Sequence, residues 1–147
     1  MRILRPAEDV YAFYAGRDGE RHAAEPNWVD TGALSLGIAA YAVVDGDHAL
    51  IYDTHVSVGH ARQMREALEA DGVRRFTVVL SHRHLDHVAG TEAFADCEIV
   101  ANERTARHLA RDRAAIEAGT LSGRRPSRRS WRPRARSPAG RPSARSS

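Results

Sequence analysis

The sequence predicts an α/β fold, in which strands and helices alternate around one core. Segments of strand length and segments with helical spacing follow one another between residues 33 and 118. One of them, residues 76–80, is apolar almost throughout, which is typical of a strand covered on both faces. With 147 residues, 42% of them hydrophobic and 28% charged, the chain has the size and composition of one globular domain.

The first elements expected along the chain are strands. Residues 1–30 carry little pattern, and only residues 10–14 indicate a short strand or a turn of helix. Residues 38–44 form an apolar run of strand length. Residues 45–47 (Asp-Gly-Asp) are typical of a hairpin turn, because glycine adopts a positive φ without strain. Residues 48–52 then return as the partner strand.

Helices and further strands follow. We expect a helix over residues 59–71, since Ala61, Met64 and Leu68 recur at helical spacing and Gly72 stands where a helix ends. The sequence then predicts a strand at 76–80, a polar loop at 81–90, a short helix capped by Thr91 and running to Phe94, a strand at 98–100 and a helix from 102 to about 118.

Charge divides the chain into two parts. All 22 basic residues are arginine, and nine of them lie in residues 122–147, where there is no acid. That Arg/Ser/Pro-rich segment has no aliphatic side chain larger than alanine, so it is predicted to be a disordered basic tail. Residues 1–121 hold 13 arginines against 19 acids, a net charge of −6, and are predicted to form the folded part.

The residues that carry chemistry lie in the loop after the strand at 76–80. This loop reads Ser-His-Arg-His-Leu-Asp-His-Val-Ala-Gly over residues 81–90, with three histidines and an aspartate within six positions. Neutral imidazole and carboxylate are ligands that zinc and related divalent ions prefer. In a loop leaving a strand, His82 and His84 can point the same way, while Asp86 and His87 reach a second point nearby. The spacing therefore predicts a metal site.

This His-x-His-x-Asp-His pattern resembles the signature of the metallo-β-lactamase superfamily. The resemblance extends to the order of elements, which are a hairpin strand ending in Asp53, a helix, an apolar strand, the histidine loop, and Gly90 before a short helix. It covers about residues 32–118. The resemblance implies the N-terminal half of an αββα metallo-β-lactamase sandwich.

The resemblance also implies roles for individual residues. His82 and His84 would bind one metal ion, and Asp86 and His87 would bind a second; zinc is the implied metal. Asp86 would orient the attacking water, and Asp53 would steady the loop through hydrogen bonds. The implied function is hydrolysis of an ester, thioester, lactone or similar bond in a small-molecule substrate by metal-activated water.

The second half of the family pattern is not recognisable in the sequence. After His87 the only histidine is His108, which lies on a predicted helix among arginines. Each implied ion therefore has two protein ligands, whereas a catalytic zinc normally has three, and we expect impaired activity. The abrupt change in composition after Gly119 predicts a truncated or frameshifted second half. One face of the sheet should then stay uncovered and favour self-association.

Other residues and functions carry separate expectations. His55, His60 and His108 are expected on the surface, and Cys97, the only cysteine, as a small buried residue. The Arg-rich segment could instead bind a nucleic acid or an acidic surface, although such tails bind without specificity. A partner chain could also complete the metal site in an obligate oligomer. The absence of a signal peptide and of a long apolar stretch favours the cytoplasm and no membrane partner.

Overall fold

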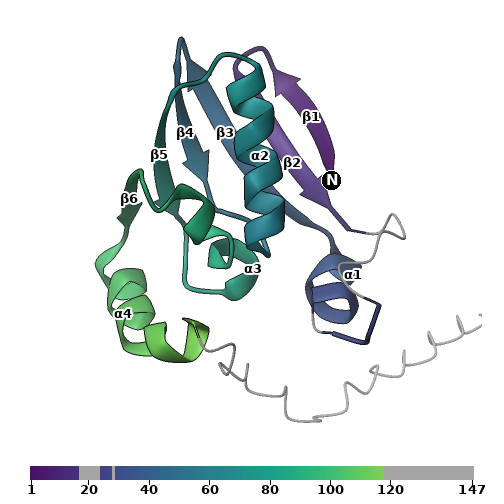
Figure 1. The fold of residues 1–147 in the computed structure, drawn as a ribbon, viewed down its shortest axis with the longest axis vertical. Coiled ribbons are helices and arrows are strands. Elements are labelled where there is room, and N and C mark those ends of the chain that lie inside the picture. The colour runs from purple at the N-terminus through teal and green to yellow at the C-terminus, as the bar shows by residue number, and fades with distance from the viewer. Residues whose placement is uncertain (17–23, 28, 118–147) are drawn as a thin grey trace, which may run out of the picture.

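Six strands form one mixed sheet in the computed structural model, which describes residues 1–16, 24–27 and 29–117 (Figure 1). In spatial order they are β1 (Arg2–Ala7), β2 (Val10–Ala15), β3 (Ile38–Asp45), β4 (His48–Tyr52), β5 (Arg75–Leu80) and β6 (Glu98–Ala101). Strands β1 to β4 pair antiparallel, whereas β4, β5 and β6 run parallel. The predicted α/β class is confirmed.

The hairpin between β3 and β4 sets the register at the centre of the sheet. Asp45 pairs with His48, and Gly46 takes a positive φ of 58° in the two-residue turn between them. Both strands match their predicted positions, and residues 10–14 belong to strand β2. Strand β1 was not predicted. All of its residues are exposed, so it lacks the alternation that marks a half-buried strand.

Helices lie on one face of the sheet and at one end of it (Figure 1). They are the short η1 (Val29–Ala33) and α1 (Leu34–Leu36), then α2 (Val58–Ala70), α3 (Leu85–Val88), the 3-10 turn η2 (Thr91–Phe94) and α4 (Glu103–Glu117). In the described part of the chain, no helix is both long and apolar enough to cross a membrane.

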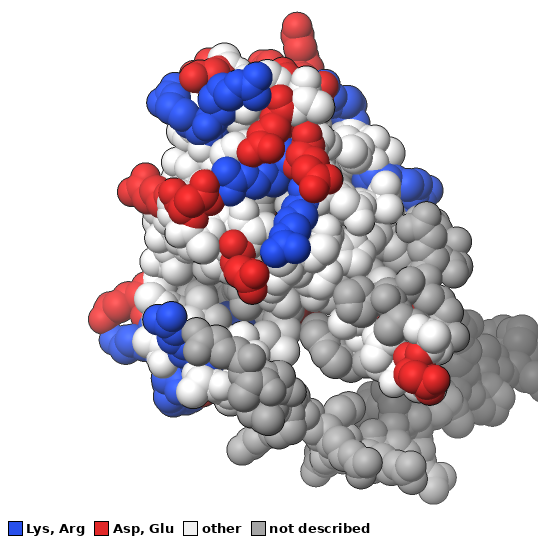
Figure 2. Space-filling model, in the orientation of Figure 1, with Lys and Arg blue, Asp and Glu red and all other residues white. Residues whose placement is uncertain are grey.

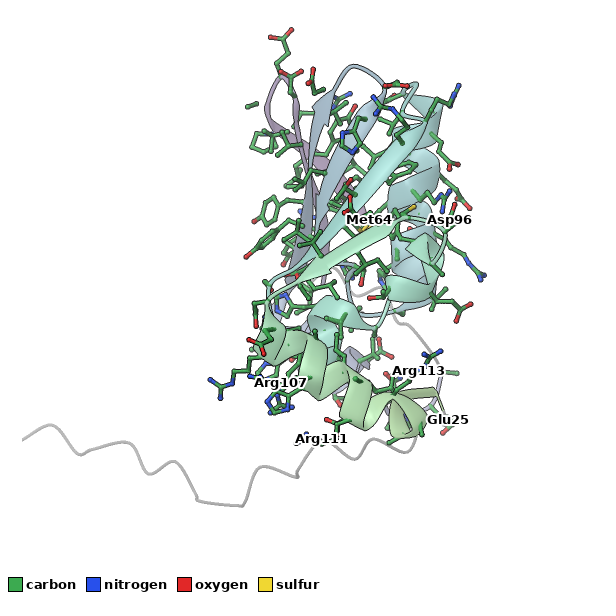
Figure 3. All side chains as sticks on the ribbon, turned by 90° about the vertical axis from the view of Figure 1, so that its left-hand side faces the viewer. Glu25, Met64, Asp96, Arg107, Arg111 and Arg113 are labelled. Atoms are coloured by element: carbon green, nitrogen blue, oxygen red, sulfur yellow. The ribbon has the colours of Figure 1, made fainter. Side chains whose placement is uncertain are left out.

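The core lies between α2 and the sheet. Ser57 caps α2, since its side chain accepts a hydrogen bond from the His60 amide, and Gly72 follows the helix with a φ of 99°. Met64 and Leu68 project from α2 onto the sheet and are fully buried, as Figure 3 shows for Met64. On the outer side of this layer, arginines and acids are interspersed (Figure 2).

The opposite face of the sheet has no helix or second sheet over it within the described residues (Figure 3). Phe76, Val78 and Leu80 of β5 point towards α2 and are buried, but Thr77 and Val79 are only half-buried. Within the described residues this strand is therefore covered on one face only, although its apolar pattern is typical of a strand covered on both. The expected uncovered face is present.

Two local predictions need correction. Residues 81–90 are not loop throughout, because α3 occupies Leu85–Val88; four residues are too few to show a helical period. Thr91 is the first residue of η2 rather than its cap. Its hydroxyl donates instead to the Val88 carbonyl at 2.7 Å, and Gly90 holds the cap position.

Candidate metal centre

The histidine loop begins where β5 ends, beside the end of β4. Asp53 follows β4 directly, and its amide donates to the Val79 carbonyl at 3.0 Å, so the parallel pairing continues one residue beyond the strand. Asp53 then turns with a φ of 65°. This conformation is uncommon for a residue other than glycine, and it directs the buried carboxylate beneath the loop.

Asp53 is hydrogen-bonded to both ends of the loop. Its Oδ1 accepts from the Ser81 amide at 2.8 Å, and its Oδ2 accepts from the Ser81 hydroxyl at 2.7 Å. The same Oδ2 lies 2.7 Å from Nδ1 of His87. Because a carboxylate can only accept, His87 carries its proton on Nδ1 and presents a lone pair on Nε2.

His82 is oriented by the same network through Ser81. Its Nδ1 lies 2.8 Å from the Ser81 hydroxyl oxygen. That hydroxyl has one hydrogen, which it donates to Asp53, so it must accept from His82. His82 therefore also carries its proton on Nδ1 and leaves Nε2 unprotonated. One buried carboxylate thus fixes the tautomers of two histidines.

The three imidazole rings of the loop lie together. Ring centroids are 4.5 Å apart for His82 and His84, and 4.2 Å apart for His82 and His87. Burial lowers the pKa of His82, and the neighbouring His87 and His84 lower it further, which favours the neutral form that binds metals. Asp86 completes the cluster, with Oδ2 at 3.5 Å from Nε2 of His87.

The side chains of the cluster are of the types that bind a divalent ion, but too few of them converge on one point. Nitrogen lone pairs beside a carboxylate are what zinc takes from proteins. Across residues 1–16, 24–27 and 29–117, however, no three histidine, cysteine or acidic side chains are placed to hold one ion together. A site built from these residues would hold an ion through two donors and leave further positions for other groups.

Ser81 and Thr54 are functional candidates that the sequence did not identify. Thr54 holds the backbone of the loop, since its amide and its hydroxyl both donate to the His87 carbonyl, at 2.7 Å and 3.2 Å. Asp53 and Thr54 together fix the side chain and the main chain of His87. The available signal was that Thr54 and Ser81 lie just after the strands β4 and β5, a position that does not reveal their partners.

The other histidines that the structure describes lie outside this cluster. His55 was expected on the surface and is instead fully buried, with a φ of 67° and its ring stacked on that of His60 at 4.6 Å. Its Nδ1 accepts from the Val56 amide, and its Nε2 has no hydrogen-bond partner among the described residues. His108 is partly exposed on α4. Cys97 is half-buried and donates to Asp96, so it is less enclosed than predicted.

The described residues form one mixed sheet with helices on one face, and the histidine loop lies at the carboxyl ends of its parallel strands. The family model of the metallo-β-lactamase superfamily matches residues 35–137, well over half of the chain. The chain therefore belongs to the metallo-β-lactamase superfamily. The match extends into residues 118–137, which lie outside the described residues. No curated protein matches the sequence.

Solved metallo-β-lactamase structures share the fold. TMB-1 superposes with a TM-score of 0.60 and 16% sequence identity, over 76% of this chain and 47% of that one. DIM-1 metallo-β-lactamase gives 0.59 and 19%, over 76% and 46%. FIM-1 from Pseudomonas aeruginosa, in its mono-zinc form, gives 0.58 and 15%, over 76% and 46%. The chain thus spans just under half the length of these structures.

Proposed function

We propose that the histidine loop binds zinc or a similar divalent ion, and that the chain belongs to a metal-dependent hydrolase. The observation that carries this proposal is the hydrogen-bond chain from Asp53, which leaves lone pairs on Nε2 of both His82 and His87. Histidine ligands commonly donate their other ring nitrogen to a carboxylate in this way, because the contact fixes the tautomer and raises basicity.

The proposed roles are those that the resemblance to the superfamily implies. His82 and His84 would hold one ion, and Asp86 and His87 a second. A bound divalent ion supplies Lewis acidity and lowers the pKa of a coordinated water. The Asp86 side chain is 31% exposed and can accept a hydrogen bond from water entering from solvent, which suits it to orient the nucleophile. Asp53 is buried and acts only through Ser81 and His87.

Metal affinity should reflect the small number of donors. Structural zinc sites with four protein ligands release about 10–16 kcal/mol on binding, so half that ligand number supports dissociation constants of about micromolar or weaker. Family membership supports hydrolysis of a small-molecule ester, thioester, lactone or similar bond. The choice among these substrates is a matter for assay.

The metal proposal is tested by zinc binding to residues 1–147. We expect competition with a chromophoric chelator to show binding that His84→Ala weakens at least about tenfold, since one of two donors is lost. His48→Ala is the matched control, because His48 lies on β4 and bonds to Thr77 rather than to the loop. Equal affinity of the wild type and His84→Ala would overturn the proposed site.

The hydrolase proposal needs a separate assay. Zinc-loaded chain is offered ester, thioester and lactone substrates, and turnover is compared with that of metal-free chain and of Asp86→Asn. We expect slow, zinc-dependent hydrolysis that Asp86→Asn reduces while one zinc ion remains bound by His82 and His84. Hydrolysis that is the same with and without zinc would contradict the proposal. Tight zinc binding without turnover of any substrate would support a metal-binding role and overturn the hydrolase.

A further inference from the structure

Three neighbouring strands are followed by polar residues at the end of the sheet that carries the histidine loop. Strands β4, β5 and β6 run parallel, and the residues directly after them are Asp53, Ser81 and Asn102. Because the carboxyl ends of parallel strands meet at one end of a sheet, these residues lie in a row. Hydrogen bonds join the row. Ser81 donates to Asp53 through its amide and its hydroxyl, and Asn102 Nδ2 donates to the Ser81 carbonyl at 3.3 Å.

The side-chain amide of Asn102 has two separate partners. Its Oδ1 accepts from the Thr105 amide at 2.9 Å, which caps helix α4, and its Nδ2 makes the bond to Ser81. The Asn102 carbonyl accepts from the Ala106 amide at 3.0 Å, the first bond of the helical ladder. Thr105 is buried, so the first turn of α4 is packed in place. Asn102 therefore joins a fixed helix end to the histidine loop.

The carbonyl that Asn102 holds belongs to the peptide that joins Ser81 to His82. A peptide unit is planar, so a bond to its oxygen also restrains the amide and the Cα of His82. On the other side of Ser81, Asp53 holds the amide and the hydroxyl. The 2.8 Å contact between the Ser81 hydroxyl and His82 Nδ1 depends on this backbone orientation, because the two side chains leave adjacent Cα atoms. Asn102 and Asp53 thus restrain His82 from the two sides of Ser81.

A helix cap alone does not account for this asparagine. Asparagine, aspartate and serine are about equally good caps, because the cap uses only the side-chain oxygen. The Nδ2 donor is therefore spare as far as α4 is concerned, and its partner is the Ser81 carbonyl. Aspartate has no donor to make that bond. The two roles of the side chain are carried by different atoms and can be separated.

We propose that Asn102 is a positioning residue for the metal loop. By holding the Ser81–His82 peptide, it keeps the His82 ring in the orientation that leaves Nε2 available to an ion. The part of this inference that concerns metal binding rests on the proposed function. The orientation of the His82 ring is a property of the metal-free chain and can be measured without an ion.

Asn102→Asp tests the proposal, because aspartate keeps the capping oxygen and loses the donor. Hydrogen exchange should show the Thr105 amide protected in Asn102→Asp and less protected in Asn102→Ala, which loses the cap. Nitrogen NMR of metal-free Asn102→Asp should show His82 sampling both ring tautomers and His87 unchanged, since His87 contacts Asp53 directly. Zinc affinity should fall by about fivefold, the effect of one lost hydrogen bond.

Ala106→Asp is the matched control, because it adds the same negative charge at an exposed position of α4. It should leave the His82 tautomer and the zinc affinity unchanged. A wild-type His82 spectrum in Asn102→Asp would overturn the proposal, and so would a change confined to Asn102→Ala, because Asn102 would then act as a helix cap alone. If the wild type binds no zinc, the proposed function fails, and the metal-free His82 spectrum still decides whether Asn102 positions the loop.

Discussion

Asp53 Oδ2 and His87 Nδ1 lie 2.7 Å apart, and this contact links a strand end to the histidine loop 34 residues later. The carboxylate is buried, and its other hydrogen bonds come from Ser81. It therefore determines where the protons of two histidines lie. Two side chains separated in sequence act as one unit because parallel strands β4 and β5 end at the same edge.

Asp53→Asn should reduce zinc affinity by about 10-fold to 100-fold, the usual effect of losing a group that orients a metal ligand. The asparagine amide can donate towards Nδ1 of His87 and so reverse the tautomer. Nitrogen NMR of the histidine rings reports the proton position without metal. Asp47→Asn, on the exposed β3–β4 turn, is the control. If the ring tautomers and the zinc affinity are unchanged in Asp53→Asn, Asp53 does not orient these histidines for metal binding.

Ser81→Ala should reduce zinc affinity less than Asp53→Asn does, and it should change the tautomer of His82 alone. The hydroxyl relays the constraint from Asp53 to His82, whereas His87 contacts Asp53 directly. Without Ser81, the His82 ring should sample both tautomers, and zinc affinity should fall by about tenfold or less. Ser35→Ala removes an exposed hydroxyl and serves as control. A change in the His87 tautomer in Ser81→Ala would contradict the prediction that Ser81 orients only His82.

The sequence predicted those parts of the fold that depend on local pattern. The hairpin of β3 and β4 needs only Asp-Gly-Asp between apolar runs, and α2 needs only its apolar spacing and Gly72. The histidine cluster was visible for the same reason, since its residues lie within six positions. Strand β1 has no such signal, because its pairing with β2 is a tertiary contact.

The surroundings of the site could not be derived in the same way. Ser81 acts through Asp53, and Thr54 through the His87 carbonyl, contacts that span 28 and 33 residues. His55 was expected on the surface because nothing local indicates that Asp53 and His55 both turn with positive φ. That turn carries His55 into the interior. Such features follow from packing between elements, which periodicity does not encode.

Gly90→Ala should destabilise the fold through sterics alone. An added Cβ would lie 1.9 Å from the Thr54 carbonyl oxygen and 2.5 Å from Ala61 Cβ, so backbone must move. We expect a loss of about 1–3 kcal/mol or more in the free energy of unfolding. A Cβ added at Gly59, within α2, would lie 3.7 Å from Ser57 Oγ, an ordinary contact, so Gly59→Ala should be neutral or stabilising by about 0.5–1 kcal/mol. Equal stabilities from denaturant unfolding of the two variants would contradict this.

His55 should make the fold sensitive to mild acid. Burial, with a smaller contribution from His60, lowers the pKa of His55 from 6.5 to about 3. As pH falls below 6.5, the unfolded chain takes up this proton and the folded chain does not, so stability present above pH 6.5 is lost on the way down. The loss is about 1.4 kcal/mol per pH unit between about pH 6 and 4. His55→Asn cannot titrate and tolerates positive φ, so its unfolding free energy should fall less steeply with falling pH than that of the wild type. If the unfolding free energy falls equally steeply with falling pH in the wild type and in His55→Asn, His55 takes up its proton equally in the folded and unfolded states.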